Sequence, residues 1–213
     1  MSGAVASGPD TLRLARDERA DLADFLDTLT SEPWDGPTLC ARWRVRDVVA
    51  HVISYEELSK VGLVGRVLRG GLAGDRVNAV GVRDYADRSP AQLVALLRDH
   101  LNPRGLTAGF GGRIALTDGL IHHQDIRRAL DRPRTIPAER LRVALDFGRT
   151  APTIHARSRI RGLRLVATDL DWSTGDGPLV EGPAEPLLMA IAGRPTTDEL
   201  AGPGLPTLVS RIS

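Results

Sequence analysis

The stretch that decides the fold is Thr117-Asp118-Gly119-Leu120-Ile121-His122-His123-Gln124-Asp125-Ile126-Arg127-Arg128. It is a predicted helix with most of the concentrated polar chemistry of the chain. At about 100° per residue, spacings of three and four residues bring Asp118, His122 and Asp125 into one sector, whereas His123 points away. A carboxylate and an imidazole one turn apart in an apolar segment form half of a metal site. The other half must come from another segment.

Apolar periodicity predicts further helices around this one. Leucines, valines and isoleucines recur at helical spacing, and Ser89-Pro90 is an N-terminal capping signal. The predicted helices cover residues 11–29, 45–58, 91–101, 113–130 and 137–150. Residues 61–87 combine apolar pairs with several glycines, which indicates a short helix followed by a mobile loop where substrate specificity could reside.

After residue 155 the pattern changes to a small α/β region. Alternation between residues 163 and 172 favours a strand, Gly175-Asp176-Gly177 indicates a hairpin turn, and residues 179–181 form a returning strand. A short apolar helix follows at 184–192, and residues 205–212 form a last apolar element. The sequence therefore predicts a helical domain over residues 1–155 and a small C-terminal α/β domain over residues 156–213.

Composition excludes several classes of protein. The 213 residues are 42% hydrophobic, which is ample for a buried core, and their net charge of +1 with 4% aromatic residues argues against nucleic-acid binding. One cysteine, Cys40, excludes an internal disulfide and fits a reducing compartment. The start of the chain has no signal-peptide pattern, and no segment has the roughly 20 apolar residues of a membrane span. We therefore expect a cytoplasmic protein that binds neither membrane nor nucleic acid.

A second histidine supplies the missing half of the site. His51, at the flank of the apolar stripe of the 45–58 helix, would face Asp118 and His122, so that two imidazoles and one carboxylate surround a divalent metal. Spacing alone favours the simpler interpretation, in which His51 is a hydrogen-bonded core histidine and Asp118 and His122 form an aspartate–histidine pair.

Two aspartates are candidates for orienting the histidine rings through hydrogen bonds. Asp125 could accept a hydrogen bond from His122, or it could form a salt bridge with Arg127 or Arg128. Asp47, one turn before His51, could orient that ring, or it could be a first-turn acid favoured by the helix dipole.

Other reactive side chains have simpler interpretations. Cys40 lies in a loop without a histidine close in sequence and is expected to pack rather than to react. Glu56 and Glu57 are possible general bases but are interpreted as surface acids. We assign no catalytic side chain beyond the metal centre itself.

Two motifs resemble the mycothiol-dependent maleylpyruvate isomerase family, part of the DinB-like superfamily. The first is Trp34-Asp35-Gly36-Pro37-Thr38-Leu39-Cys40-Ala41-Arg42-Trp43-Arg44-Val45-Arg46-Asp47-Val48-Val49-Ala50-His51, and the second is Asp118-Gly119-Leu120-Ile121-His122-His123-Gln124-Asp125-Ile126. The resemblance implies a DinB-like four-helix bundle followed by a small C-terminal α/β domain. It also implies zinc held by His51, Asp118 and His122, with Asp118 standing where the family commonly has glutamate.

The resemblance also implies a chemistry. The metal would bind a low-molecular-weight thiol, with mycothiol as the expected co-substrate, and keep it as a thiolate for attack on a small electrophile. Attack would lead to S-transfer or to cis/trans isomerisation. Two alternatives remain open, namely metal-assisted hydrolysis by bound water and a non-catalytic bundle that binds a small ligand. The substrate and the oligomeric state are not determined by the sequence.

Overall fold

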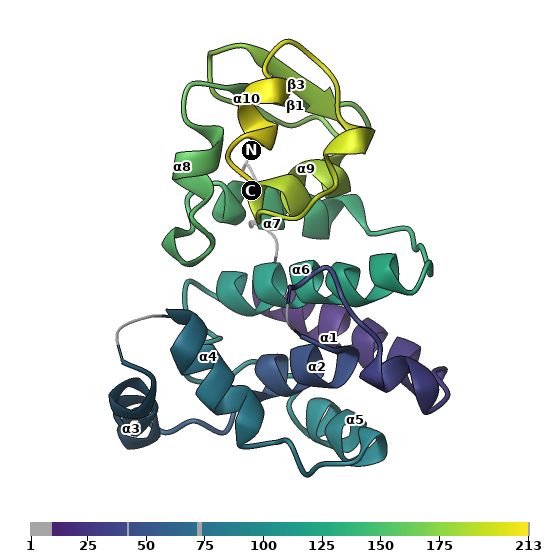
Figure 1. The fold of residues 1–213 in the computed structure, drawn as a ribbon, viewed down its shortest axis with the longest axis vertical. Helices are drawn as coiled ribbons and strands as arrows, with labels where there is room; N and C mark the ends of the chain where they lie inside the picture. Colours follow the sequence, from purple (N-terminus) through teal and green to yellow (C-terminus); the bar gives the residue numbers. More distant parts are fainter. Residues whose placement is uncertain (1–9, 42, 72–73, 213) are drawn as a thin grey trace, which may run out of the picture.

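The computed structural model describes residues 10–41, 43–71 and 74–212 and shows a helical bundle below a smaller mixed region (Figure 1). Its four bundle helices are α1 (Thr11–Asp27), α2 (Val45–Ser54), α5 (Pro90–Asp99) and α6 (Arg113–Ala129). Helices α1 and α2 each pack against both α5 and α6. The four-helix bundle predicted from the sequence is confirmed.

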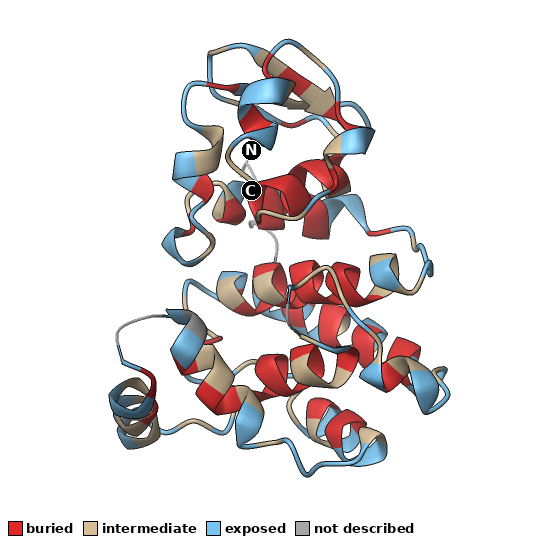
Figure 2. Ribbon diagram, in the orientation of Figure 1, coloured by how far each residue is buried: buried red, intermediate tan, exposed pale blue. Residues whose placement is uncertain are grey.

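The bundle helices begin where their capping residues stand. Asp10 accepts a hydrogen bond from the backbone N–H of Arg13 at the start of α1, and Ser89 and Gln92 form a capping box at α5. Their apolar faces meet in one buried cluster, visible as the inward red faces in Figure 2. Trp34, from the 3-10 helix Glu32–Asp35, belongs to this cluster and is 2% exposed. The loop before α2 is therefore anchored to the core.

The segment between α2 and α5 differs from its prediction. It forms two helices, α3 (Lys60–Gly70) and α4 (Gly74–Arg83), rather than one helix and a loop. A Cβ at Gly70 would lie 2.8 Å from the Cα of Val77, so the absence of a side chain allows the helices to cross closely. Gly70 therefore permits helix packing, and Gly71, with a left-handed φ of 73°, ends α3.

The C-terminal half combines helices with a three-stranded sheet. Its elements are α7 (Ala138–Gly148), α8 (Ala156–Ile160), β1 (Arg164–Ala167), β2 (Ser173–Thr174), β3 (Leu179–Gly182), α9 (Ala184–Ile191) and α10 (Leu205–Val209), with 3-10 turns at Pro152–Ile154 and Thr197–Glu199. The strand order is β2-β1-β3, with β1 antiparallel to β2 and parallel to β3.

The predicted hairpin at Gly175 is wrong. The strand after it, β3, pairs in parallel with β1, in the register Leu165 with Val180, and does not pair back onto β2. A Cβ at Gly175 or Gly177 would collide with the backbone of Leu163 or Gly162. Glycine is needed at both positions because the segment between β2 and β3 lies directly against the backbone just before β1.

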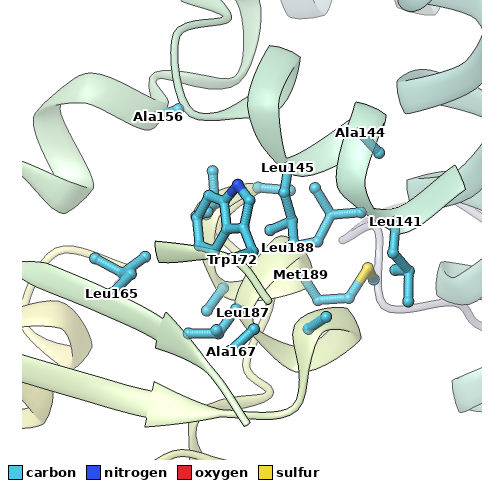
Figure 3. Close-up of a cluster of buried hydrophobic side chains, with 14 of the residues drawn as sticks. Leu141, Ala144, Leu145, Ala156, Leu165, Ala167, Trp172, Leu187, Leu188 and Met189 are labelled. Carbon is cyan, nitrogen blue, oxygen red and sulfur yellow. The ribbon is translucent and has the colours of Figure 1, made fainter. Parts of the chain in front are cut away.

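One apolar cluster joins the last helices to the sheet. Figure 3 shows side chains of α7 and α9 gathered beside Trp172, among them Leu145 and Leu188. The cluster extends to Leu120 and Ile121 of α6, and α7 lies on the N-terminal side of residue 155. The division into 1–155 and 156–213 stays a prediction.

Within the described ranges, no helix is long and apolar enough to cross a membrane. Residues 1–9, on which the signal-peptide prediction rested, lie outside the described part of the chain.

Truncating the shared core should destabilise the whole fold. Leu188 is fully buried in the cluster, so Leu188→Ala is expected to lower the free energy of unfolding by about 2–5 kcal/mol. Chemical denaturation followed by circular dichroism measures this change. Leu68→Ala is the matched control, because Leu68 is 80% exposed on α3, and it should change stability little. Equal effects of the two substitutions would contradict the packing described.

Candidate metal centre

Helices α2 and α6 bring the three predicted ligands together. His51 lies in the last turn of α2, and Asp118 and His122 lie one turn apart on α6. The Oδ1 of Asp118 is 3.7 Å from the Nε2 of His51 and 3.6 Å from the Nε2 of His122. One ligand atom from each residue lies within 4.8 Å of the others. This spacing suits three donors around a single ion.

The cluster is closed on one side and open on the other. His51 and His122 are 5% and 7% exposed, whereas the side chain of Asp118 is 42% exposed. A small molecule can therefore approach from the side of Asp118. An open position beside three protein ligands is typical of catalytic rather than structural metal sites.

The protonation states of these groups favour metal binding. Although its side chain is partly exposed, desolvation by the surrounding protein tends to raise the pKa of Asp118, but the neighbouring His122 and His51 hold the pKa of that carboxyl well below its ordinary value. Burial lowers the pKa of His51, against the opposing effect of Asp118. The site therefore offers an ionised carboxylate and a neutral imidazole at neutral pH, which are the forms that coordinate metal ions.

His122 is held from behind by a polar chain. Its Nδ1 lies 2.9 Å from the Oδ2 of Asp125, which is fully buried. The guanidinium of Arg194 donates two hydrogen bonds to that carboxylate, from Nε to Oδ1 at 2.8 Å and from Nη2 to Oδ2 at 2.7 Å. The predicted contact between Asp125 and His122 is present.

The alternative pairing of Asp125 with its neighbouring arginines is wrong. Arg128 forms ion pairs with Glu185 and Glu199, and Arg127 donates to the Nε2 of His123. Burial tends to raise the pKa of Asp125, but the hydrogen bonds from Arg194 and His122 lower it overall. Asp125 is therefore an ionised acceptor that fixes the orientation of His122.

Asp47 does not orient His51. Its carboxylate accepts hydrogen bonds from the backbone and side chain of Arg44, which closes the start of α2. It therefore takes the other predicted role, that of a first-turn acid. In the described part of the chain, the buried Nδ1 of His51 has no hydrogen-bond partner.

Aromatic rings surround His51 instead. The ring centroid of Trp43 lies 4.7 Å from that of His51 and 6.0 Å from that of His122. Tyr55 meets His51 edge-on at 5.7 Å, and its hydroxyl donates to Asn78 of α4. Helix α4 therefore reaches the surroundings of the site through Tyr55.

Cys40 lies closer to the centre than the sequence suggested. Its sulfur belongs to a second group of donor atoms, with His122 and Asp125, that lie within 4.8 Å of one another. Both carboxylate oxygens of that Asp125 already accept hydrogen bonds from Arg194. The group of His51, Asp118 and His122 is therefore the better candidate for binding an ion. Cys40 lies beside it, near His122 and Asp125.

The surface interpretation of Glu56 is wrong. Its side chain is 1% exposed and is paired with Arg19 at 2.5 Å, and it also accepts a hydrogen bond from Thr107. Glu57 is half-exposed and contacts Tyr85 and His100. Glu56 joins α1, α2 and the loop before α6, so its role is structural.

His123 faces away from the centre, as predicted, into a buried ionic cluster. Its Nδ1 lies 2.9 Å from Glu18, which also accepts hydrogen bonds from Arg134 and Arg140. Burial lowers the pKa of His123 to about 4. Burial tends to raise the pKa of Glu18, but His123 and Arg134 bring it down to about 2. This cluster ties α1 to α6 on the far side from the candidate centre.

Sequence reasoning missed three neighbours of the site. Arg194 is 69 positions from Asp125, so no local periodicity could connect them. Trp43 and Cys40 precede α2 in a loop, where helical phase gives no direction. The only signal for Trp43 and Cys40 was their presence inside the first motif that resembled the family.

Comparison with known proteins identifies the fold and matches the N-terminal segment to a known family. Residues 15–104 match the family described as Mycothiol maleylpyruvate isomerase N-terminal domain. Crystal structures of the mycothiol-dependent maleylpyruvate isomerase and of a histidine-to-alanine mutant each have a TM-score of 0.56 and 15% sequence identity, with 91% of both chains covered. No curated protein matches the chain.

The architecture thus defines a DinB-like helical bundle with a small α/β part. The N-terminal segment, residues 15–104, matches the mycothiol maleylpyruvate isomerase family, and the fold of the whole chain is similar to that of the solved isomerase. The matched family segment ends at residue 104, before α6. The case for Asp118 and His122 as ligands therefore rests on the geometry of this chain.

Acid should destabilise the fold through Glu18. Its pKa is about 2, below the ordinary 4.5, so its ionised form stabilises the fold above that ordinary pKa and this contribution is lost as the pH falls toward 2. The shift corresponds to about 3 kcal/mol. Glu18→Gln should therefore flatten the fall in unfolding free energy between about pH 4.5 and pH 2, the range between the unfolded and the folded pKa, as measured by urea denaturation.

The control for this prediction is Glu139→Gln, because Glu139 is a half-exposed partner of Arg13 on the surface. It should retain the pH dependence of the wild type. An unchanged slope in the Glu18 variant would contradict the assignment of acid sensitivity to this cluster.

Proposed function

We propose that this protein is a metal-dependent, thiol-dependent S-transferase or isomerase that acts on a small electrophilic substrate. The proposed metal is zinc, held by His51, Asp118 and His122, and the proposed thiol is mycothiol. The observation that carries the proposal is the convergence of these three donors, within 4.8 Å, from two packed helices. The family of the N-terminal segment supports mycothiol as the thiol.

The donor set fits a catalytic zinc ion. Zinc commonly takes three protein ligands of nitrogen and oxygen type and leaves a fourth position free. The carboxylate of Asp118 is shorter than the glutamate common in the family, yet its Oδ1 lies at similar distances from both imidazoles, 3.7 and 3.6 Å. A zinc ion bound there would lower the pKa of a coordinated thiol and so favour the thiolate.

The residues of this chain prepare the site for that chemistry. Asp125 and Arg194 fix the His122 ring so that its Nε2 faces Asp118. The histidine rings close the inner side, so that a thiol and an electrophile must approach past Asp118. Helix α4, which replaces the predicted loop, borders this side through Asn78 and Tyr55, and we propose it as a determinant of substrate specificity.

The same geometry indicates what each half of the chain contributes to the site. We propose that residues 1–155 supply the metal ligands and that residues 156–213 form the small α/β domain that supports them through Arg194. A cytoplasmic location is part of the proposal, because a reduced Cys40 and a free low-molecular-weight thiol both suit a reducing compartment.

Metal binding tests the ligand assignment. The chelated wild-type protein is expected to take up about one equivalent of zinc, since the three donors form one site. His51→Ala and Asp118→Asn should each weaken binding by at least about tenfold, because each removes a ligand, whereas Asp118→Glu should retain it. Competition with a chromophoric chelator measures the affinities.

The control for zinc binding is His155→Asn, because His155 lies in the α7–α8 connection with a left-handed backbone (φ 53°) that asparagine tolerates. It should bind zinc like the wild type. Equally poor binding by the wild type and by His51→Ala would refute the metal site.

Thiol dependence tests the reaction class. A panel of electrophiles is incubated with the zinc-loaded protein, with and without mycothiol, and the products are identified by mass spectrometry. We expect thiol adducts or isomerised substrate only when mycothiol is present, and neither with His122→Ala. Turnover that yields hydrolysis products without any thiol would instead establish a zinc-dependent hydrolase.

A further inference from the structure

The two histidines of the candidate centre are supported in different ways. His122 has the buried chain of Asp125 and Arg194 behind its Nδ1. His51 has no corresponding acceptor in the described part of the chain, although its Nδ1 is buried. Metal-binding histidines almost always use their second ring nitrogen in such a hydrogen bond. Something else must set the orientation of the His51 ring.

Trp43 contacts both imidazole rings. Its centroid lies 4.7 Å from His51 with an interplanar angle of 43°, and 6.0 Å from His122 with an angle of 38°. Both distances fall in the range of favourable aromatic pairs. Tyr55 contacts His51 edge-on, but the structure gives it no ring contact with His122. Trp43 is therefore the shared aromatic neighbour of the two nitrogen donors.

The backbone around Trp43 is fixed on both sides. Its N–H donates to the carbonyl of Cys40 at 3.1 Å, and its carbonyl accepts a hydrogen bond from the Thr38 hydroxyl at 2.9 Å. The next residue, Arg44, pairs with Pro37 in a β-bridge before α2 begins. The backbone that carries the indole is thus fixed between the loop and the start of α2, and the side chain packs against the apolar core of the bundle.

We propose that Trp43 is a positioning residue that orients His51 for metal coordination through ring packing, in place of a hydrogen bond. This inference rests on the proposed metal site. Rotation of an imidazole about its Cβ–Cγ bond is only weakly restricted by the bond itself. Contact with the indole restricts it, so that less orientational freedom is lost when the ring binds a metal ion.

Cobalt(II) tests the proposal, because it reports both affinity and ligand geometry. Trp43→Leu keeps an apolar side chain but removes the ring, and it is expected to weaken cobalt binding about tenfold and to alter the visible absorption bands of the bound ion. Trp43→Phe restores a ring and should bind within about threefold of the wild type with wild-type bands. Thermal unfolding in the presence of chelator measures the stability of each variant without metal.

Tyr55→Phe is the matched control, since it keeps the other ring on His51 and loses only the hydroxyl; it should leave affinity and spectrum unchanged. If Trp43→Leu does not fold, Trp43→Met is used in its place, and the same weakening of cobalt binding is expected. Wild-type affinity and spectrum in a folded variant without the ring would overturn the positioning role. Failure of the wild type itself to bind cobalt or zinc would instead overturn the proposed metal site.

Discussion

The buried carboxylate of Asp125 is the constraint on which the rest of the structure depends. An ionised carboxylate without partners would be very costly in this interior, and here both of its oxygens are satisfied by Arg194 and His122. Arg194 follows Gly193, whose left-handed backbone (φ 85°) ends α9 and turns the chain, with the Arg194 N–H donating back to Met189. The fold of the C-terminal region therefore sets the orientation of a side chain on α6.

This arrangement gives the two imidazoles of the centre different support. The His122 ring is fixed by charged hydrogen bonds that cross from one half of the chain to the other, while the His51 ring lies among aromatic side chains. The carboxylate between them, Asp118, is the exposed member of the set. Well-packed candidate ligands with one accessible side suit a small-molecule metal site, because such a site needs its ligands in place before an ion or substrate arrives.

Periodicity in the sequence predicted the bundle helices and the shared face of Asp118, His122 and Asp125, since these features depend on local spacing. The place of His51 beside an apolar helical stripe suggested it as the third ligand, and the resemblance to the family favoured the metal site over the alternatives. Contacts between distant segments could not be predicted in this way. The Arg194 partner of Asp125 and the parallel pairing of β3 depend on tertiary packing, and the glycines at Gly70 and Gly175 serve close backbone approach rather than the predicted loop and hairpin.

The most direct test of the central claim is X-ray absorption at the zinc edge of the zinc-loaded protein. With His51, Asp118 and His122 as ligands, the first shell should contain nitrogen and oxygen at about 2.0–2.2 Å and no sulfur, and adding mycothiol should introduce one sulfur at about 2.3 Å. A sulfur ligand before any thiol is added would assign the metal to the group containing Cys40. A first shell unchanged by mycothiol would contradict the thiol-dependent account.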